Sequence, residues 1–457
     1  MDINTYVNKN FDSFVRDLSG WLEIPSISSE KSRKADVRRA IDYAGNRLKK
    51  LGFTTSVWSV PGSQPCLFAQ RIESKKSPTL LVYGHADVQP VDPLSEWIKP
   101  PFKPWVSKDK GRIYARGSSD DKGQAMMYVK ACEYWIKNFK KLPLNVKFLI
   151  EGEEEIGSPY LEKIIRKHKD LLSNALCLFS DSNMIKSGYP AISYATRGLV
   201  YFEVEVKGPN SDLHSGGFGG IVLNPLFALV AILRSMVGKD GKILIPGFYK
   251  GVLSMSKAEK QSLKRISFMG DYLAKVAGVK PYGGEKGRSL LERVWARPTF
   301  EVHGIVGGFQ DEGSKTVIPK QAKAKVSMRL VPKQDPKHII SAFKKYVKKV
   351  NPKGVKVSVK LISGGGPAFY EDTKHPYFKL AMQSLKFAFK KEPAMMRIGG
   401  SIFVPEILKR MFPKSPVIPI GFGLADDNVH APNEWFDLGN FKKGIISSAK
   451  LMELLGK

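Results

Sequence analysis

Short apolar runs separated by amphipathic stretches characterise the first part of the chain. Runs at 79–84, 145–150 and 175–180 have the length and composition of buried strands, and another lies at 416–421. Before and between these runs, apolar residues recur at helical spacing. The predicted helices are 4–23, 35–51, 123–137 and 160–172. This order predicts an α/β fold, in which helices flank a central mixed sheet.

The middle of the chain has a different pattern. Residues 200–206 and 323–330 alternate apolar and polar side chains, as expected of strands with one face in water. Helical stretches lie between and after them, which predicts an inserted α+β domain. The glycine-rich segment 363–367 marks its far end. The predicted domains are a discontinuous first domain, 1–192 with 367–457, and an inserted domain, 193–366.

Length and composition are typical of a globular protein with two or three domains. The chain has 457 residues, of which 42% are hydrophobic and 25% charged. Its longest nearly apolar stretch, 221–233, is shorter than the roughly 20 residues that cross a bilayer. The first residues mix charges into a helical pattern and do not resemble a signal peptide. We therefore expect a cytoplasmic protein with no membrane partner.

The chain is strongly basic, with 73 Lys and Arg against 43 Asp and Glu and a formal net charge of +30. The basic residues are scattered and accompany no zinc-finger or RNA-recognition spacing, so we expect no specific nucleic-acid partner. The cysteines, Cys66, Cys132 and Cys177, form no Cys-x-x-Cys pair. This favours buried thiols over a disulfide framework or a zinc ribbon.

Ionisable residues follow the apolar runs. They are His85 and Asp87 after the first run, Glu151 to Glu155 after the second, Asp181 after the third and His430 after the last. Asp120 and Asp121 stand before the predicted helix 123–137. Because ligands of open α/β sheets gather beyond the carboxyl ends of the strands, we expect these groups to meet at one edge of the sheet.

So many carboxylates at close range would repel one another and raise each other's pKa. A divalent cation removes this difficulty, and mixed imidazole and carboxylate ligands suit zinc or manganese. Each motif alone is more typical of a helix cap or a solvated loop. Their joint occurrence at element ends instead favours a metal site, in which a carboxylate bridges two ions, as in two-metal hydrolases.

Motifs in these positions resemble those of a known family. In chain order they are YGHADVQP, YARGSSDDKG, EGEEEIGS, SDLHSGGFGG, KTVIP, MRLVP, GGSI and LADDNVHAPNE. Together they resemble the M20 metallopeptidases, in particular the branch of carnosinases and cytosolic nonspecific dipeptidases. The Asp-Asp-Lys-Gly form of the second motif is similar to that branch rather than to the deacylases. The resemblance covers nearly the whole chain.

The resemblance implies two divalent ions, zinc or manganese with cobalt as a further option. The implied metal ligands are His85, Asp120 as the bridge, Glu155, Asp181 and His430. Asp87 is expected to orient His85. Glu154 is the implied general base, which takes a proton from a bridging water and passes it to the leaving amine. An extended loop would turn the adjacent glutamates in different directions, and Glu153 is expected to be solvated.

The resemblance also implies substrate contacts within the inserted domain and near its end. His214 resembles the family histidine that one subunit offers to the active site of the other, which implies a homodimer. The remaining implied substrate-binding residues are Thr316, Arg329, Arg397, Gly400 and Ser401. Arg329 would grip a free carboxylate. Gly400 and Ser401, expected at a helix start, would offer backbone N–H groups to the same carboxylate.

The predicted function is hydrolysis of dipeptides or short peptides with a free C-terminal carboxylate. The sequence departs from the dipeptidase pattern at Ile398, where that branch typically has a glutamate near the substrate's amino end. This departure leaves an N-acyl amino acid amidohydrolase with the same metals as an alternative. A basic binding protein on a peptidase scaffold is a remote alternative, because no candidate ligand or base is missing.

Overall fold

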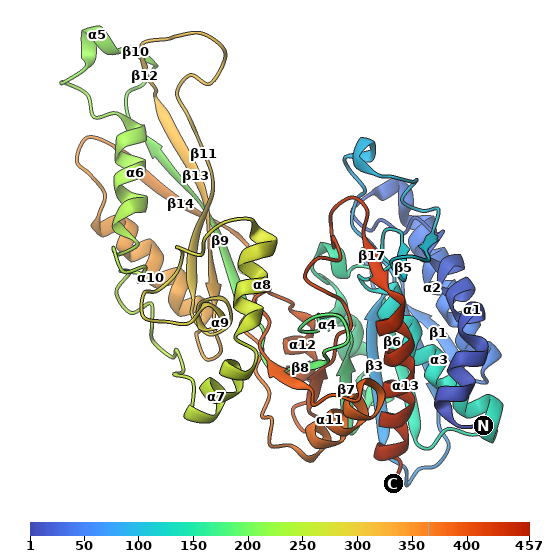
Figure 1. The fold of residues 1–457 in the computed structure, drawn as a ribbon. Helices are drawn as coiled ribbons and strands as arrows, with labels where there is room; N and C mark the ends of the chain where they lie inside the picture. Colours follow the sequence, from blue (N-terminus) through green and yellow to red (C-terminus); the bar gives the residue numbers. More distant parts are fainter. Residues whose placement is uncertain (364) are drawn as a thin grey trace. The chain divides into compact units, whose positions relative to one another are not determined.

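The computed structural model describes residues 1–363 and 365–457, so Gly364 of the predicted boundary 363–367 lies outside the described residues. The chain divides into two compact units (Figure 1). The first comprises Met1–Tyr194, Glu371–Met396 and Ile407–Lys457, and the second comprises Ala195–Tyr370 and Arg397–Glu406. The predicted boundaries, 193 and 366, lie within a few residues of the observed ones, Ala195 and Tyr370. The larger difference is at 397–406, which was assigned to the first domain but packs with the second unit.

The first unit is built on a six-stranded mixed sheet in the order β1-β2-β6-β3-β7-β16. Its strands are β1 (Thr54–Trp58), β2 (Cys66–Arg71), β3 (Thr79–His85), β6 (Asn145–Glu151), β7 (Leu176–Phe179) and β16 (Val417–Pro419). β6, β3, β7 and β16 are parallel, whereas β2 pairs antiparallel with β6 and β1 with β2. The four apolar runs therefore form the parallel strands, whose carboxyl ends share one edge.

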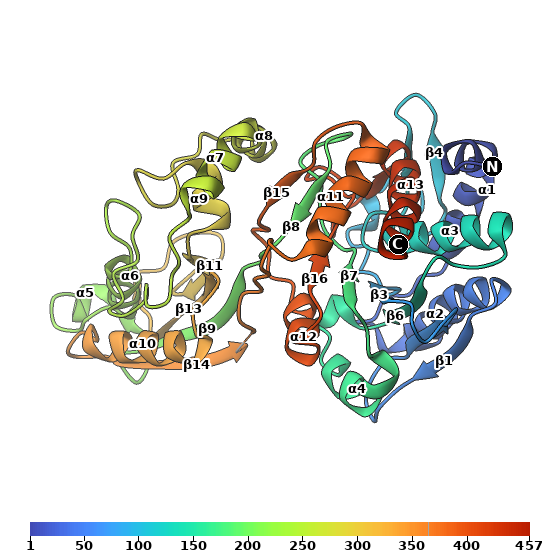
Figure 2. The same cartoon turned by 90° about the horizontal axis from the view of Figure 1, so that it is seen from below.

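Helices cover both faces of this sheet. Figure 2 shows α3 and α13 on one face and α2 and α4 on the other. The helices of this unit are α1 (Ile3–Leu22), α2 (Lys34–Lys50), α3 (Lys122–Phe139), α4 (Leu161–Lys167), α11 (Pro376–Phe389) and α13 (Leu438–Leu455), with α12 (Val404–Met411) beginning in the second unit. Small strands complete it: β4 (Trp105–Ser107), β5 (Arg112–Tyr114) and β17 (Trp435–Asp437) in one sheet, and β8 (Ala191–Ser193) with β15 (Ala394–Met396) in another. The cysteines of this unit are buried free thiols.

The second unit contains a four-stranded antiparallel sheet in the order β11-β13-β9-β14. Its strands are β9 (Gly198–Lys207), β11 (Thr299–Gly307), β13 (Gln321–Leu330) and β14 (Lys356–Ser363). β9 buries every second residue, from Val200 to Val206, against α6 (Pro225–Ser235) and α10 (Pro336–Lys349). The other face is more polar, as the alternating pattern predicts.

Short elements complete the second unit. They are β10 (Leu213–His214) paired with β12 (Val317–Ile318), and the helices α5 (Ser215–Phe218), α7 (Lys257–Arg265), α8 (Phe268–Ala277) and α9 (Leu290–Trp295). Among residues 1–363 and 365–457, no helix has both the length and the apolar character needed to cross a bilayer.

Candidate metal centre

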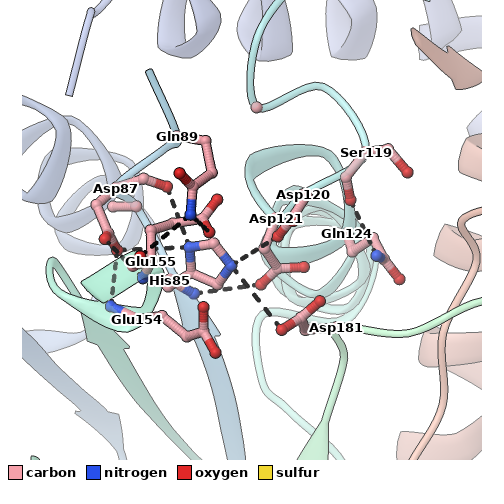
Figure 3. A network of polar contacts seen from close by, with 12 residues as sticks. His85, Asp87, Gln89, Ser119, Asp120, Asp121, Gln124, Glu154, Glu155 and Asp181 are labelled. Atoms are coloured by element: carbon pink, nitrogen blue, oxygen red, sulfur yellow. Dashed lines mark hydrogen bonds and ion pairs between the residues drawn. The ribbon is translucent and has the colours of Figure 1, made fainter. Parts of the chain in front are cut away.

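His85 ends β3 and is fully buried, with its imidazole at the carboxyl edge of the sheet (Figure 3). Its Nδ1 lies 3.1 Å from the carbonyl oxygen of Asp87 and 3.4 Å from Oδ1 of the same residue. Two oxygen acceptors on this side favour a proton on Nδ1, which leaves the lone pair on Nε2 for a metal. Asp87 thus places two oxygen atoms on the Nδ1 side of His85, which is the geometry that an orienting role requires.

Asp120 places one carboxylate oxygen toward each imidazole of the cluster. Its Oδ1 is 2.9 Å from Nε2 of His85, and its Oδ2 is 3.0 Å from Nε2 of His430. The His430 Nε2 is also 3.2 Å from Oε2 of Glu155, and the His85 Nε2 is 3.9 Å from Oδ2 of Asp181. The structure thus brings together all five predicted ligands, with Asp120 between two histidine–carboxylate pairs.

The donor atoms are close enough to share a cation. Ligand atoms of His85, Asp120 and Glu155 lie within 4.8 Å of one another, and so do those of His85, Glu154 and Asp181. Imidazole and carboxylate donors are the types that bind zinc and manganese. The donor chemistry and spacing of these residues therefore fit a divalent metal.

The acidic run after β6 folds as a turn and not as the extended loop that was expected. Glu154 begins a short 3₁₀ helix that ends at Ile156. The carboxylate of Asp87 accepts the backbone N–H of Glu154 at 3.2 Å and that of Glu155 at 3.1 Å. Asp87 consequently holds this turn as well as the imidazole of His85, and it is the turn that directs the two glutamates toward the cluster.

Glu153 was expected to be solvated, and this is wrong. Its side chain is buried and accepts the backbone N–H groups of Gln64 at 3.0 Å and of Tyr160 at 2.9 Å. These bonds join the turn to two neighbouring loops. Glu153 thus has a structural role that a run of acidic letters does not reveal.

Glu434 supports the loop that carries Asp120, and sequence reasoning missed it. Its buried carboxylate accepts the backbone N–H groups of Gly117 and Ser119 at 2.9 Å and of Asp120 at 3.2 Å, and it pairs with Arg116 at 2.9 Å. Glu434 lies within the motif that contains His430, but nothing in the sequence indicates which backbone it caps. Gln89, also unassigned, donates to Oε2 of Glu155 at 2.9 Å.

The electrostatics of the cluster favour bound positive charge. Burial, followed by the negative charge of Asp120, raises the pKa of both Glu155 and Asp181 to about 7. Burial also raises the pKa of Glu154 well above its usual range. Burial opposes ionisation of Asp120, but hydrogen bonds from His430 and His85 outweigh it and lower the pKa of Asp120. The neighbouring carboxyl groups therefore do not all ionise readily without a cation.

The predicted substrate-binding residues all lie in the second unit, in two places. His214 is exposed on β10 opposite Val317, beside Thr316, whose carbonyl accepts the Ser215 N–H at 3.0 Å. At the other end of β13, Arg329 donates to the Ser401 hydroxyl at 2.7 Å.

The segment 397–401 does not begin a helix, contrary to what was expected for Gly400 and Ser401. Gly400 and Ser401 are not at a helix start, because α12 begins at Val404. Their backbone N–H groups therefore do not form the helix terminus that was expected. Arg397 is buried and forms an ion pair with Glu259.

The chain belongs to the peptidase family M20/M25/M40, whose family model matches residues 81–454. The fold and the metal-type cluster agree with this class, and the predicted resemblance is confirmed. The protein is therefore a metallopeptidase, a class of hydrolase that uses divalent metal.

Individual relatives match over almost the whole chain. Beta-Ala-His dipeptidase of Mus musculus is 32% identical over 96% of this chain and 92% of its own length. Cys-Gly metallodipeptidase dug1 of Schizosaccharomyces pombe is 32% identical over 96% of this chain and 94% of its own. Among solved structures, the metallo-carboxypeptidase Sso-CP2 of Sulfolobus solfataricus matches with a TM-score of 0.84 and 30% identity, covering 100% of both chains.

Metal binding is expected to release protons. In the metal-free protein, Glu155 and Asp181 keep protons up to a pKa of about 7, and hydrogen bonds to Asp120 and Glu155 raise the pKa of His430 to about 10. A metal needs the unprotonated donors, so affinity should rise as the pH increases through about 7, where Glu155 and Asp181 lose their protons, and further toward about 10, where His430 does. Calorimetric titration with zinc in buffers of different ionisation enthalpy measures the protons released. Affinity that is independent of pH, with no proton release, would contradict this account.

Replacing Glu434 with Gln is expected to weaken metal binding by about 10- to 100-fold, the usual effect of removing a partner that holds a ligand in place. The change removes the charge that pairs with Arg116 and disturbs the loop of Asp120. Competition with a chelator measures the affinity, and circular dichroism verifies folding. Glu453→Gln, which changes an ion pair of the C-terminal helix, is the matched control. Equal affinity in both variants would show that Glu434 does not support the metal centre.

Proposed function

We propose that this protein hydrolyses the peptide bond of dipeptides or short peptides that carry a free C-terminal carboxylate. The observation that carries the proposal is the position of Asp120, with one oxygen toward each histidine and Glu154 beside the same cluster. The first unit would be the catalytic domain. The second unit would be a lid and dimerisation domain that supplies substrate contacts.

Two divalent ions fit the cluster, zinc or manganese, with cobalt as a further option. His85, Asp120 and Asp181 would hold one ion, and His430, Asp120 and Glu155 the other, as the distances within each set suggest. When bound, such ions polarise a peptide carbonyl and acidify water. The chain's own contribution is to fix the donors through Asp87 and Glu434.

Glu154 would move the proton. Its carboxylate is next to the metal ligands but is not needed to complete either set, and burial raises its pKa well above the usual range. A carboxylate with a raised pKa is a better proton acceptor near neutral pH. Glu154 would take a proton from the attacking water and pass it to the departing amine.

Relatives named as Beta-Ala-His and Cys-Gly dipeptidases support a dipeptide substrate. The second candidate activity is hydrolysis of N-acyl amino acids. Ile398 favours it, because an apolar side chain offers no charge to a substrate ammonium group. The side chain of Ile398 lies beside Gly400, one of the proposed substrate-binding residues: a Cβ added at Gly400 would be 3.7 Å from Cγ2 of Ile398. Comparing the hydrolysis of a free dipeptide with that of an N-acetylated amino acid separates the two activities.

A second copy of this chain is the proposed partner. The second unit exposes large apolar side chains on and beside α5, α6 and the edge strand β11. They are Phe218, Ile221, Phe227, Val230 and Val306. An exposed strand edge beside apolar helix surface is typical of an association site. A two-fold dimer would cover it.

Geometry within the second unit also favours a dimer. Arg329 lies near the end of β13, where it is opposite Leu199. His214 lies at the other end of this strand, because its partner Val317 comes just before the first residue of β13, Gln321. A strand of this length spans roughly 30 Å, which is several times the length of a dipeptide. If both side chains contact one substrate molecule, they come from different copies of the chain.

Replacing Glu154 with Gln is expected to lower kcat for dipeptide hydrolysis by about 10²- to 10⁴-fold, because the amide cannot accept the proton. Metal content, measured by elemental analysis, should stay the same since Glu154 is outside both proposed ligand sets. Glu312→Gln, at an exposed position, is the control for the same chemical change. Near-normal turnover in the Glu154 variant would remove this residue from its proposed role.

Replacing His214 with Ala is expected to reduce activity strongly, and so is replacing Asp120 with Asn. A heterodimer of the two variants should recover activity, because one of its two sites would combine an intact Asp120 with an intact His214 from the other copy. The measurement is kcat for separately tagged, purified heterodimers. Complete inactivity of a verified heterodimer would mean that His214 acts within its own chain.

A further inference from the structure

A second arginine, Arg197, lies beside the proposed carboxylate-binding residues of the second unit. Arg197 immediately precedes β9, and Arg329 on β13 is paired with Leu199 of β9. The two guanidinium groups therefore start from neighbouring positions of adjacent strands. Nothing in the motifs of the sequence singled out Arg197.

Arg197 holds the loop that carries Ser401. Its Nε–H donates to the carbonyl oxygen of Gly399 at 2.5 Å, and its backbone N–H donates to that of Gly400 at 2.9 Å. The Ser401 hydroxyl in turn accepts from Arg329 at 2.7 Å and donates to the carbonyl oxygen of Gly198 at 3.1 Å. Two arginines and one short loop thus form a single hydrogen-bonded unit.

The glycine at 399 allows this close approach. A Cβ at that position would lie 2.9 Å from Cγ1 of Val294 and 3.6 Å from Nη2 of Arg197. The first distance is shorter than real Cβ contacts, so a side chain at 399 would clash with Val294, whereas the second is an ordinary contact. Glycine at 399 therefore lets the loop pack against Val294 while its carbonyl oxygen accepts from Arg197.

Two cations close together need compensation. Burial, followed by the charge of Arg329, lowers the pKa of Arg197 to about 10, and burial lowers the pKa of Arg329. The negative charge of Glu301 opposes both shifts but does not cancel them. In the part of the chain that the structure describes, neither guanidinium forms an ion pair with a carboxylate, and the Nη groups of Arg197 make no hydrogen bond. A guanidinium carries five N–H donors, so several donors remain for an anion.

A purely structural loop anchor would not need a charge. A neutral side chain with one N–H donor could bond to the carbonyl oxygen of Gly399 without placing a second cation beside Arg329. Unused N–H donors and two neighbouring positive charges are instead the features with which arginine side chains bind a carboxylate.

We propose that Arg197 is a positioning and specificity residue, which holds the Gly399–Ser401 loop and adds the second positive charge of a site for the substrate's C-terminal carboxylate. This inference rests on the proposed function for the identity of the ligand. The charge of Arg197 would make the site prefer a substrate with a free carboxylate over one with a neutral C-terminal amide. Arg197 acts with Arg329 in this preference.

The test compares the binding of a dipeptide with that of its C-terminal amide, using full-length metal-loaded protein. Glu154→Gln is the background, so that neither ligand is consumed, and calorimetry gives Kd. Arg197→Gln keeps an N–H donor for Gly399 and removes the charge, whereas Arg197→Lys keeps the charge. Arg329→Gln is the positive control, and thermal unfolding verifies that each variant is folded.

Arg197→Gln is expected to raise Kd for the dipeptide about tenfold or more, and Kd for the amide less than about twofold, because only the charge-assisted interaction is lost. Arg197→Lys should keep most of the preference for the dipeptide. If Arg197→Gln weakens the binding of the dipeptide and of the amide equally, or weakens neither, the proposal is overturned. Failure of the dipeptide to bind the protein with Arg197 intact contradicts the carboxylate site itself.

Activity of the otherwise unmodified enzyme separates this inference from the proposed function. If the enzyme does not hydrolyse dipeptides but the binding preference depends on the charge of Arg197, the reaction is wrong and the carboxylate site stands. If it hydrolyses dipeptides and amides equally well before and after Arg197→Gln, the reaction stands and the role of Arg197 is wrong.

Discussion

The contact on which the site depends is that of the Asp120 carboxylate with two imidazoles, at 2.9 Å from His85 and 3.0 Å from His430. It joins the end of a sheet strand, the start of a buried helix and a loop from far along the chain. Around it lie more carboxyl groups than can ionise together in a buried place, as the raised pKa values of Glu155 and Asp181 show. The fold therefore assembles a site whose acidic groups are compensated when a divalent cation binds.

Neighbouring groups hold this contact in place. Asp87 accepts from the backbone of the glutamate turn and faces the imidazole of His85, and Glu434 accepts from the backbone next to Asp120. Both carboxylates are almost completely buried. Each is used to bind N–H groups of the chain, so neither needs to coordinate a metal. Such supporting partners fix donor direction, which determines metal affinity as much as the donors themselves.

Much of the first unit could be predicted from the sequence, because long buried strands are nearly continuous apolar runs. His85 and Asp181 lie where they were expected since the carboxyl ends of parallel strands share an edge. The roles of Glu153 and Glu434 could not be predicted, because their partners are backbone N–H groups that become neighbours only after folding. Likewise, nothing local indicates that Arg397 and its neighbours pack with the second unit, since that depends on long-range contacts across the chain.

Anomalous diffraction from crystals grown with zinc or manganese tests the central claim most directly. The account predicts two anomalous peaks about 3.5–4 Å apart, bridged by Asp120, with His85 and Asp181 at one and His430 and Glu155 at the other. A single peak, or peaks away from Asp120, would contradict it.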